Sequence, residues 1–502
     1  MTNHLFDPLF GRHSGSDTPF VTTPGGATMS HAEFLTLSAR MANVFAELKL
    51  QKGDRVAVQV GKSVPALAIY AACLRSGLVL LPLNTGYTVS ELDYFLQDAE
   101  PGLVVCDPAQ ADALHAILPD GATLLTLDAQ GGGSLTDRAA EAAAEHTPLS
   151  CGPDDLAAIL YTSGTTGRSK GAMLTHDNLL SNAQALADLW RFSERDTLLH
   201  ALPIFHTHGL FVAVNVCALS GAAMLFHPGF KLDAIIDDLP RATVLMGVPT
   251  FYTRLLADAR FTRDLVAHMR LFVSGSAPLL AETHEAFEAR TGHRILERYG
   301  MTETNMNVSN PYDGERRAGT VGFPLPGVDL RITDPQTGAT LPDGDIGMIE
   351  VRGPNVFKGY WRMPEKTAEE LRDNGFFITG DLGQIDAQGY VAIVGRQKDL
   401  IISGGYNIYP KEIEVLLDSL PEVNESAVIG VPDADFGEAV LAAVVPAPGT
   451  TPDPEALLDR IRPELARFKH PRAIHIVEEL PRNTMGKVQK NILRQTFTPK
   501  PA

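Results

Sequence analysis

Cysteine is scarce in this sequence, and basic residues do not balance the acidic ones. The 502 residues include four cysteines, none of them in a CxxC pair. Such sparse usage is typical of a reducing compartment and gives no basis for a disulfide framework. Lysine and arginine total 42 against 60 acidic residues, a formal charge of −18. Because nucleic acids and anionic membranes are bound through basic surfaces, this balance argues against both as partners.

Long hydrophobic runs and a secretory leader are also missing. The first sixteen residues, MTNHLFDPLFGRHSGS, have no apolar core of the kind that signal peptides carry. The most apolar stretch, 65–83, is interrupted by Arg75, so a buried helix followed by a strand explains it better than a membrane span. We therefore expect a cytoplasmic protein. Its length predicts two to four domains, because single cores rarely exceed about 250–300 residues.

The N-terminal part alternates short β-rich runs with amphipathic segments. Strands are predicted at 55–60, 78–83, 103–106 and 156–161, and helices at 64–76, 91–98 and 176–190. Such alternation predicts α/β layers around a largely parallel sheet. After about residue 320 the pattern changes to short strands and turns, with strands predicted at 328–333, 348–352, 376–379 and 390–394. This part is predicted to form a β-rich subdomain.

A separate α+β unit is predicted from about residue 400 onward. Its expected helices are 410–417 and 454–466, and its expected strands are 426–431, 440–445 and 473–477. About a hundred residues are enough for an independent domain core.

The densest polar motif is YTSGTTGRSKG at 161–171, directly after a predicted strand. Gly164 and Gly167 let the backbone turn and direct N–H groups at phosphate oxygens, and Lys170 can reach the outer phosphates. The motif is not a Walker A loop, because the GxxxxGK[ST] spacing is not met. GKS at 61–63 also fails this test, since Val56 stands where the first glycine is required. The residues alone leave a flexible polar turn as an equal alternative.

The motif resembles the phosphate loop of the adenylate-forming superfamily, and further motifs of that family follow in order. They are FHTHG (205–209), VSGSAP (273–278), ERYGMTET (297–304), TGD (379–381), GRQKDLIISGG (395–405) and PRNTMGKVQK (481–490). Several ordered motifs are far more specific than one. The resemblance implies an α/β fold with a large N-terminal ATP- and acid-binding domain (1–395), a hinge (396–400) and a small mobile α+β lid domain (401–502).

The resemblance implies a two-step reaction with ATP, Mg²⁺ and CoA as co-substrate. A carboxylate attacks the α-phosphate of ATP, and a thiol then displaces AMP from the acyl-adenylate. The implied ATP- and AMP-binding residues are Thr162, Ser163, Gly164, Thr165, Thr166, Gly167, Lys170, Ser276, Ala277, Pro278, Tyr299, Gly300, Met301, Thr302, Asp381 and Arg396. Glu303 and Thr162 are the implied ligands of Mg²⁺, a hard cation that prefers oxygen.

Catalysis is implied for Lys487, Glu303 and His206. Lys487 would bridge the carboxylate and the α-phosphate, Asp399 would act as the hinge, and the CoA arm would pass Gly404, Gly405 and Tyr406. Acylation of Lys487 would remove the required charge, so a lysine acyltransferase and a deacylase are expected partners. The alternative that the HxH pair of FHTHG binds zinc is disfavoured, because no further ligands follow at zinc-site spacing.

The substrate suggested by the sequence is malonate. GVPTFYTRLL, SGSAPLL, ERYGMTETNMN and RGPNVFKGYW are similar to segments of bacterial malonyl-CoA synthetases. A second carboxylate needs a partner in a partly desolvated pocket. Arg254 is the predicted partner, and the pocket would be completed by Ser274, Thr207 and Met306.

Several alternatives remain open. Arg254 could be an ordinary surface arginine, and the acid could be methylmalonate, acetate or an aryl acid. A peptide-synthetase adenylation domain is less expected, since no carrier sequence follows residue 500. A non-catalytic CoA- or AMP-binding sensor is disfavoured, because Lys487 and Glu303 are both present.

Overall fold

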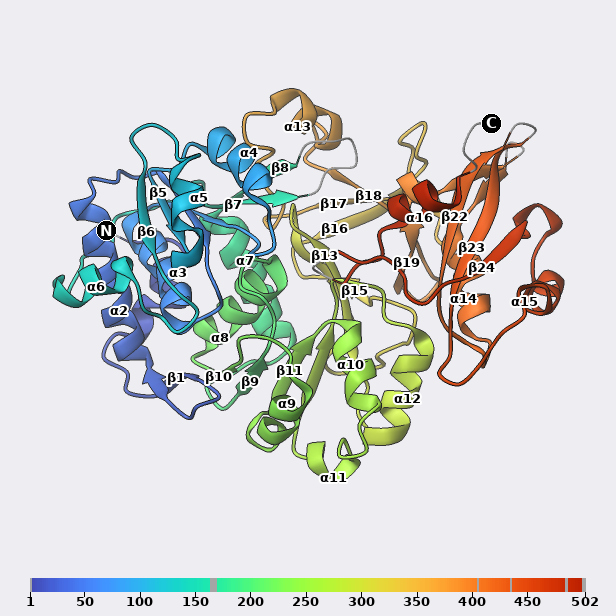
Figure 1. The fold of residues 1–502 in the computed structure, drawn as a ribbon, viewed down its shortest axis with the longest axis horizontal. Coiled ribbons are helices and arrows are strands. Elements are labelled where there is room, and N and C mark those ends of the chain that lie inside the picture. Colours follow the sequence, from blue (N-terminus) through green and yellow to red (C-terminus); the bar gives the residue numbers. More distant parts are fainter. Residues whose placement is uncertain (1, 163–168, 404–405, 434–435, 484–485, 499–502) are drawn as a thin grey trace. The chain divides into compact units, whose positions relative to one another are not determined.

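The computed structural model describes residues 2–162, 169–403, 406–433, 436–483 and 486–498 (Figure 1). The chain forms two compact units. The N-terminal unit comprises residues 1–329 and 351–377, and the C-terminal unit comprises residues 330–350 and 378–502. This division groups most of the β-rich segments with the C-terminal unit, whereas the sequence grouped them with the N-terminal domain. The predicted domain bounds and hinge stay a prediction, while the α/β class with a large first and a small last part is confirmed.

The first sheet of the N-terminal unit has six strands in the order β6-β5-β3-β4-β7-β8. Their bounds are β3 Arg55–Gln59, β4 Val79–Pro82, β5 Leu103–Cys106, β6 Thr123–Thr126, β7 Leu156–Thr162 and β8 Lys170–Thr175. All pairs are parallel except the last, in which β7 and β8 run antiparallel. Parallel strands of one sheet need crossover connections. The helix α3 (Val64–Ser76) joins β3 to its neighbour β4, and α4 (Val89–Ala99) joins β4 to β5 on the other side of β3.

Local signals fix the ends of α3. The Oγ of Ser63 accepts a hydrogen bond from the backbone N–H of Ala66 at 3.3 Å, and Pro65 lies in the first turn. The helix ends at Gly77, whose φ of 67° lies in the left-handed region that glycine adopts without strain. These signals place the residues before α3, including Lys62, at the carboxyl end of β3.

The second sheet has nine strands in the order β15-β14-β13-β12-β11-β9-β10-β1-β2. Their bounds are β1 Pro19–Thr22, β2 Thr28–Ser30, β9 Thr197–His200, β10 Ala223–Phe226, β11 Val244–Gly247, β12 Leu271–Ser274, β13 Leu296–Met301, β14 Asn305–Ser309 and β15 Phe323–Pro324. Strands β1 and β9 to β13 pair in parallel, and the outer pairs are antiparallel. The motifs VSGSAP and ERYGMTET therefore extend to the carboxyl ends of two adjacent strands, β12 and β13.

The remaining helices of the N-terminal unit are short or medium in length. They are α1 Phe6–Leu9, α2 His31–Glu47, α5 Ala111–His115, α6 Ser134–Glu141, α7 His176–Leu189, α8 Asn215–Ser220, α9 Leu232–Asp238, α10 Pro249–Leu256, α11 Arg263–Val266, α12 Ala281–Thr291 and α13 Pro364–Glu370, with the π-helix η3 at His208–Val214. No helix within the described ranges is long and apolar enough to cross a membrane.

The C-terminal unit contains two further sheets. One has the order β16-β17-β18-β19 and the other β21-β20-β23-β22, with β24 beside β23. The strands are β16 Asp329–Thr333, β17 Gly347–Arg352, β18 Phe377–Ile385, β19 Val391–Arg396, β20 Ile401–Ser403, β21 Tyr406–Ile408, β22 Val423–Asp433, β23 Gly437–Pro446 and β24 Ala473–Ile476. The helices are α14 Pro410–Asp418, α15 Pro454–Ile461 and α16 Lys490–Phe497.

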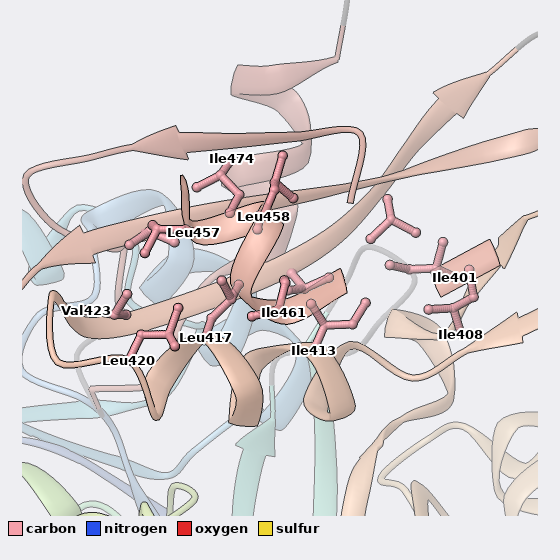
Figure 2. Packing of buried hydrophobic residues seen from close by; sticks show 14 residues of the cluster. Ile401, Ile408, Ile413, Leu417, Leu420, Val423, Leu457, Leu458, Ile461 and Ile474 are labelled. Atoms are coloured by element: carbon pink, nitrogen blue, oxygen red, sulfur yellow. The ribbon is translucent and has the colours of Figure 1, made fainter. Parts of the chain in front are cut away.

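Both faces of the β22–β23 ribbon are buried. Figure 2 shows Ile413 and Leu417 of α14 packing with Leu458 of α15 on one face, in a cluster that also contains Val428. Ile429 belongs to a second cluster that contains Leu493 of α16. Adjacent residues of the strand thus pack into cores on opposite faces, because side chains alternate between the two faces of a β-strand. Truncating one of these fully buried leucines to alanine costs about 2–5 kcal/mol.

Candidate active site

The predicted phosphate loop joins β7 to β8. Thr162 ends β7, Lys170 begins β8, and these two residues are antiparallel partners. Ser163, Gly164, Thr165, Thr166 and Gly167 lie outside the described residues. The structure therefore places both ends of the motif but not its phosphate-facing centre.

Glu303 lies in a buried polar cluster that includes both ends of this motif. Its Oε1 accepts hydrogen bonds from the Thr162 hydroxyl at 3.4 Å and from the Tyr360 hydroxyl at 3.1 Å. The Tyr360 hydroxyl also lies 2.5 Å from Oε2 of Glu370. The Nζ of Lys170 is 3.1 Å from each oxygen of Glu370 and 4.0 Å from the centre of the Tyr360 ring. Lys366 also pairs with Glu370, at 3.0 Å, so the cluster combines two carboxylates with two ammonium groups.

The protonation of this cluster follows from burial and charge. Burial and the nearby Glu303 carboxylate raise the pKa of Tyr360, so its phenol keeps its proton. Burial opposes ionisation of Glu370, but hydrogen bonds from Tyr360, Lys366 and Lys170 hold its pKa below the usual range. The oxygens of carboxylates and of hydroxyls are suitable ligands for a hard cation. The residues present at Glu303 and Thr162 therefore fit a magnesium ion.

Sequence reasoning gave no role to Tyr360 or Glu370. Tyr360 lies in the segment RGPNVFKGYW, which was used only to identify the subgroup. Glu370 ends α13, where its carboxylate would otherwise be read as a surface group. The sequence gave only a weak indication of this contact, because Glu370 and Lys170 are far apart in the chain and meet only in the folded protein.

The predicted adenine wall follows β13. Tyr299, Gly300 and Met301 end this strand and are half-buried, as is Thr302 after it. At Gly300 a Cβ would come 1.9 Å from the carbonyl oxygen of Asn305, so only glycine fits the irregular pairing with β14.

Ser276, Ala277 and Pro278 follow β12. Ser276 adopts a left-handed φ of 71°, which is unusual for a residue with a side chain. Its Oγ lies 3.2 Å from Nδ1 of His208. Ala277 is half-buried and Pro278 is exposed. Ser276 therefore connects this segment directly to the FHTHG motif.

The predicted acyl-pocket residues Ser274, Thr207 and Met306 are all buried. Ser274 ends β12 and Met306 lies on β14. Thr207 directly precedes the π-helix η3, which begins at His208. The Cε of Met306 lies 2.5 Å from where a Cβ on Gly300 would stand, so the methionine packs against the end of β13.

Arg298 is a buried arginine on β13, between the two motif-bearing strand ends. It is 3% exposed, and its guanidinium packs on Gly275, where a Cβ would come 2.4 Å from Cζ. Its Nε and Nη2 have no hydrogen-bond partner within the part of the chain that the structure describes. Burial lowers its pKa to about 9, so the group remains a cation at neutral pH.

Other polar atoms around Arg298 share this lack of partners. Within the described ranges, the hydroxyls of Ser274 and Thr207 and Nε2 of His208 are also buried without hydrogen bonds. Burial and the nearby Arg298 hold the pKa of His208 well below its usual value, so the ring is neutral. Buried polar atoms without partners are costly in a folded protein. The arrangement is therefore suited to an anionic ligand that supplies the missing acceptors.

Arg254 does not provide the desolvated cation that the sequence assigned to it. Its side chain is exposed on α10, and its guanidinium stands 5.9 Å from the centre of the Phe230 ring. The helix turns the neighbouring Tyr252 and Leu255 inward instead. The buried arginine beside Ser274 is Arg298, which lies within the motif ERYGMTET and had no predicted role of its own.

His206 is half-buried at the start of the same segment. Its Nδ1 accepts a hydrogen bond from the backbone N–H of His208 at 3.3 Å. The two rings are therefore held by different partners. Among the described residues no group of three histidine, cysteine, aspartate or glutamate side chains is arranged to hold a metal ion.

Other predicted site residues lie in the C-terminal unit. Asp381 on β18 is 3% exposed, and its Oδ1 pairs with Nε of Arg396 on β19 at 2.7 Å. Such a pair can present a carboxylate and a guanidinium to the hydroxyls of a ribose. Asp399 pairs with Arg494 of α16 at 2.8 Å.

The predicted catalytic lysine, Lys487, is exposed in the C-terminal unit. The backbone N–H of Asn483 donates to the carbonyl of Lys487 at 2.9 Å, and the N–H of Lys487 donates to Oδ1 of Asn483 at 3.0 Å. The predicted CoA residue Tyr406 is also exposed, and it stacks on Phe468 with ring centres 4.5 Å apart. Gly404 and Gly405 lie outside the described residues.

Known proteins resemble this chain over most of its length. The chain is 60% identical to an ATP-bound MatB from Rhodopseudomonas palustris, with a TM-score of 0.97 over 99% of each chain. It is 37% identical to a feruloyl-CoA synthase from Amycolatopsis sp over 94% of this chain and 95% of that protein. It is 36% identical to a mitochondrial malonate–CoA ligase from Mus musculus over 88% and 82%.

Two family models also match. The AMP-binding enzyme model covers residues 11–361, and the model of the AMP-binding enzyme C-terminal domain covers residues 412–487. The chain belongs to the AMP-binding enzyme family.

Proposed function

We propose that this enzyme joins malonate to CoA with ATP, through malonyl-AMP. The observation that carries the substrate is the buried guanidinium of Arg298, which has free donors beside the buried hydroxyls of Ser274 and Thr207. A cation in a desolvated pocket binds a second carboxylate strongly, and it is costly to leave unpaired beside an apolar acid. Relatives that include malonate–CoA ligases support the same reaction.

In the first half-reaction a carboxylate oxygen of malonate attacks the α-phosphorus of ATP. The bond to the bridging oxygen breaks, and pyrophosphate leaves with its electron pair. Arg298 would hold the distal carboxylate, so that the proximal one is oriented toward the nucleotide. Glu303 and Thr162 would hold Mg²⁺, which neutralises charge on the phosphate oxygens when it is bound.

In the second half-reaction the CoA thiol releases its proton to solvent and its sulfur attacks the carbonyl carbon of malonyl-AMP. The bond from that carbon to the phosphate oxygen breaks, and AMP leaves. Asp381 would accept hydrogen bonds from the ribose hydroxyls throughout, and Tyr299 would pack on the adenine. Because the ring of His208 is neutral, Arg298 is the positively charged group that would select the acid.

An aryl acid is the main alternative, since a feruloyl-CoA synthase is among the relatives. An aromatic ring in this pocket would leave the guanidinium of Arg298 without an anionic partner, a loss of several kcal/mol. Met306 would limit substituents on the α-carbon, so methylmalonate tests the width of the pocket. These features favour malonate.

The first prediction compares two arginines. Arg298→Met should lower kcat/KM for malonate by about 100-fold or more, because one partner of a buried ion pair is worth roughly 2–5 kcal/mol. Arg254→Met is the matched control and should change it by no more than about twofold, as for an exposed side chain. Pyrophosphate release measured with malonate, methylmalonate, acetate and an aryl acid gives kcat/KM of both variants for each acid.

The ATP affinity of Arg298→Met separates loss of acid binding from loss of structure. It should equal that of the wild type by calorimetry. A large loss with Arg254→Met and none with Arg298→Met would contradict the assignment of the acid pocket.

Regulation by acylation is a further part of this proposal. Lys487 is exposed, so a lysine acyltransferase can reach its amine. Acylation removes the positive charge while leaving most of the side chain in place. A deacylase would restore the charge and with it the adenylation step.

A further inference from the structure

A second cavity lies within the N-terminal unit, at the carboxyl ends of β3 and β4. Its volume is about 280 Å³. Residues around its rim include Val60, Lys62, Leu83, Thr85, Phe205 and Pro228. The carboxyl ends of parallel strands are where α/β sheets bind their ligands. The volume is at the small end of the range for ligand pockets, so a small molecule would fill it.

The cavity is separate from the acid pocket. Arg298, Ser274 and Met306 do not line it among the described residues. Most of its wall is apolar, from valine, leucine, proline and phenylalanine side chains. Lys62 is the only charged side chain among the described residues that line it.

Lys62 is held by neutral groups. Its Nζ lies 2.7 Å from Nδ1 of His200 and 2.9 Å from the carbonyl oxygen of the same residue. It also stands 4.2 Å from the centre of the Phe226 ring. No carboxylate pairs with it within the described part of the chain. A lysine in this setting keeps a donor position for an anion.

The tautomer of His200 follows from its other partner. Its Nε2 lies 2.8 Å from the carbonyl oxygen of Gly209, which can only accept, so Nε2 carries the proton. Nδ1 is then the acceptor for Lys62. Two other titratable groups lie nearby. Tyr70 lines the cavity and its hydroxyl donates to Asn215, and the Nε2 of His227 pairs with Asp238 at 2.9 Å. Asp238 therefore serves His227 rather than Lys62.

We propose that this cavity binds a small monocarboxylate, with the Nζ of Lys62 on the carboxylate and the apolar wall around the alkyl chain. One ammonium group matches one negative charge. A phosphate would bring two charges and three acceptors to a wall that offers few donors, so its desolvation would not be repaid. An uncharged apolar molecule would leave Lys62 as it is, without an anionic partner.

The ionisation of Lys62 gives the proposed site a signature. Burial lowers the pKa of Lys62 well below its usual value. A bound carboxylate raises that pKa again, because an opposite charge favours the ammonium form. Above the pKa of the empty site, binding must therefore take up about one proton, and affinity must fall as the pH rises.

The test uses hexanoate, whose alkyl chain is too long for an acid pocket limited by Met306. Calorimetry is performed on the full-length enzyme saturated with malonate, at pH 8, in phosphate and in Tris. Hexanamide, the uncharged isostere, is titrated in parallel. Lys62→Met removes the cation, and Lys49→Met, an exposed lysine of the same unit, is the matched control.

We expect one hexanoate per chain, with an uptake of protons that grows as the pH is raised and is seen as a difference between the two buffers. Lys62→Met and the change to hexanamide should each weaken binding by about tenfold or more, the value of a charge-assisted hydrogen bond. Lys49→Met should bind as the wild type does.

Three results would overturn the proposal. They are an absence of hexanoate binding at concentrations up to about 10 mM, equal binding of hexanamide and hexanoate, and equal affinity of Lys62→Met and the wild type for hexanoate. The hexanamide comparison needs no substitution, so it decides the question even if Lys62→Met fails to fold.

Discussion

At the scale of single residues, Tyr360 has an unusual position. Its hydroxyl has one proton and two carboxylate neighbours, Glu303 and Glu370. Only one of them can receive a full hydrogen bond at a time. Lys170 and Lys366 pair with Glu370 and offset its charge, and Tyr360 and Thr162 are hydrogen-bonding neighbours that help to orient Glu303. A carboxylate that must meet a metal ion in a fixed direction gains from such a neighbour.

Tyr360→Phe should therefore weaken the binding of Mg²⁺ more than it lowers the stability of the fold. We expect the Mg²⁺ concentration for half-maximal pyrophosphate release to rise by about 10-fold, the lower part of the range for groups that orient metal ligands. Tyr70→Phe is the control, since its buried hydroxyl donates to Asn215 at 3.1 Å, away from Glu303. An equal shift in both variants would show a general loss of structure instead.

At the scale of elements, most of the fold could be predicted from local signals. The strand predicted at 103–106 coincides with β5, and the helix predicted at 64–76 coincides with α3, because Ser63 and Gly77 mark its two ends. The π-helix at His208–Val214 was not predicted. It includes Gly209, where a Cβ would come 2.0 Å from the carbonyl oxygen of Pro203, so only glycine allows this close approach of the backbone.

The site was less predictable than the fold. Motifs located the segments, but they did not say which arginine is buried. Arg254 and Arg298 both lie among apolar neighbours in the sequence, and only the packing of β12 against β13 turns one of them inward. The position of a residue along a strand or helix determines on which face of that element its side chain lies. Whether that face is buried depends on the other elements that pack against it.

The α14 element carries its own pH dependence. Burial raises the pKa of Asp418 to about 6, although Ser426 donates a hydrogen bond to it at 2.7 Å. The folded state thus binds a proton more readily than the unfolded state between about pH 4 and 6, so this group costs stability as the pH rises through that range.

Asp418→Asn should therefore raise the stability of the C-terminal unit at pH 8 and much less at pH 4. A pKa shift of this size corresponds to roughly 1–3 kcal/mol at the higher pH. Thermal unfolding at the two pH values measures the difference. Asp459→Asn, an exposed carboxylate that pairs with Arg462, is the control. A variant that is less stable than the wild type at pH 8 would contradict the assignment.

At the scale of the whole molecule, the residues proposed to act in the reaction are divided between two units. Glu303, Lys170 and Arg298 belong to the N-terminal unit, and Lys487 belongs to the C-terminal unit. The half-reactions make different demands, because attack of a carboxylate on ATP brings negative charges together, whereas attack of a thiol on the acyl-adenylate does not need the same cation. A lysine on a separate unit can serve the first step alone.

Lys487→Ala and Lys487→Gln should therefore separate the two half-reactions. Removing the cation should lower malonate-dependent pyrophosphate release by about 100-fold or more, since it removes charge stabilisation that acts in the transition state. Transfer of presynthesised malonyl-AMP to CoA should fall by no more than about threefold, because that step does not use the charge. Lys490→Ala is a nearby control on α16, where the lysine pairs with Glu414 at 2.5 Å.

Because Lys487→Gln resembles an acylated lysine, equal loss of adenylation in Lys487→Ala and Lys487→Gln would support acylation as the off-switch. Loss of thioester formation from malonyl-AMP to the same extent as adenylation would remove the role of Lys487 from the first step.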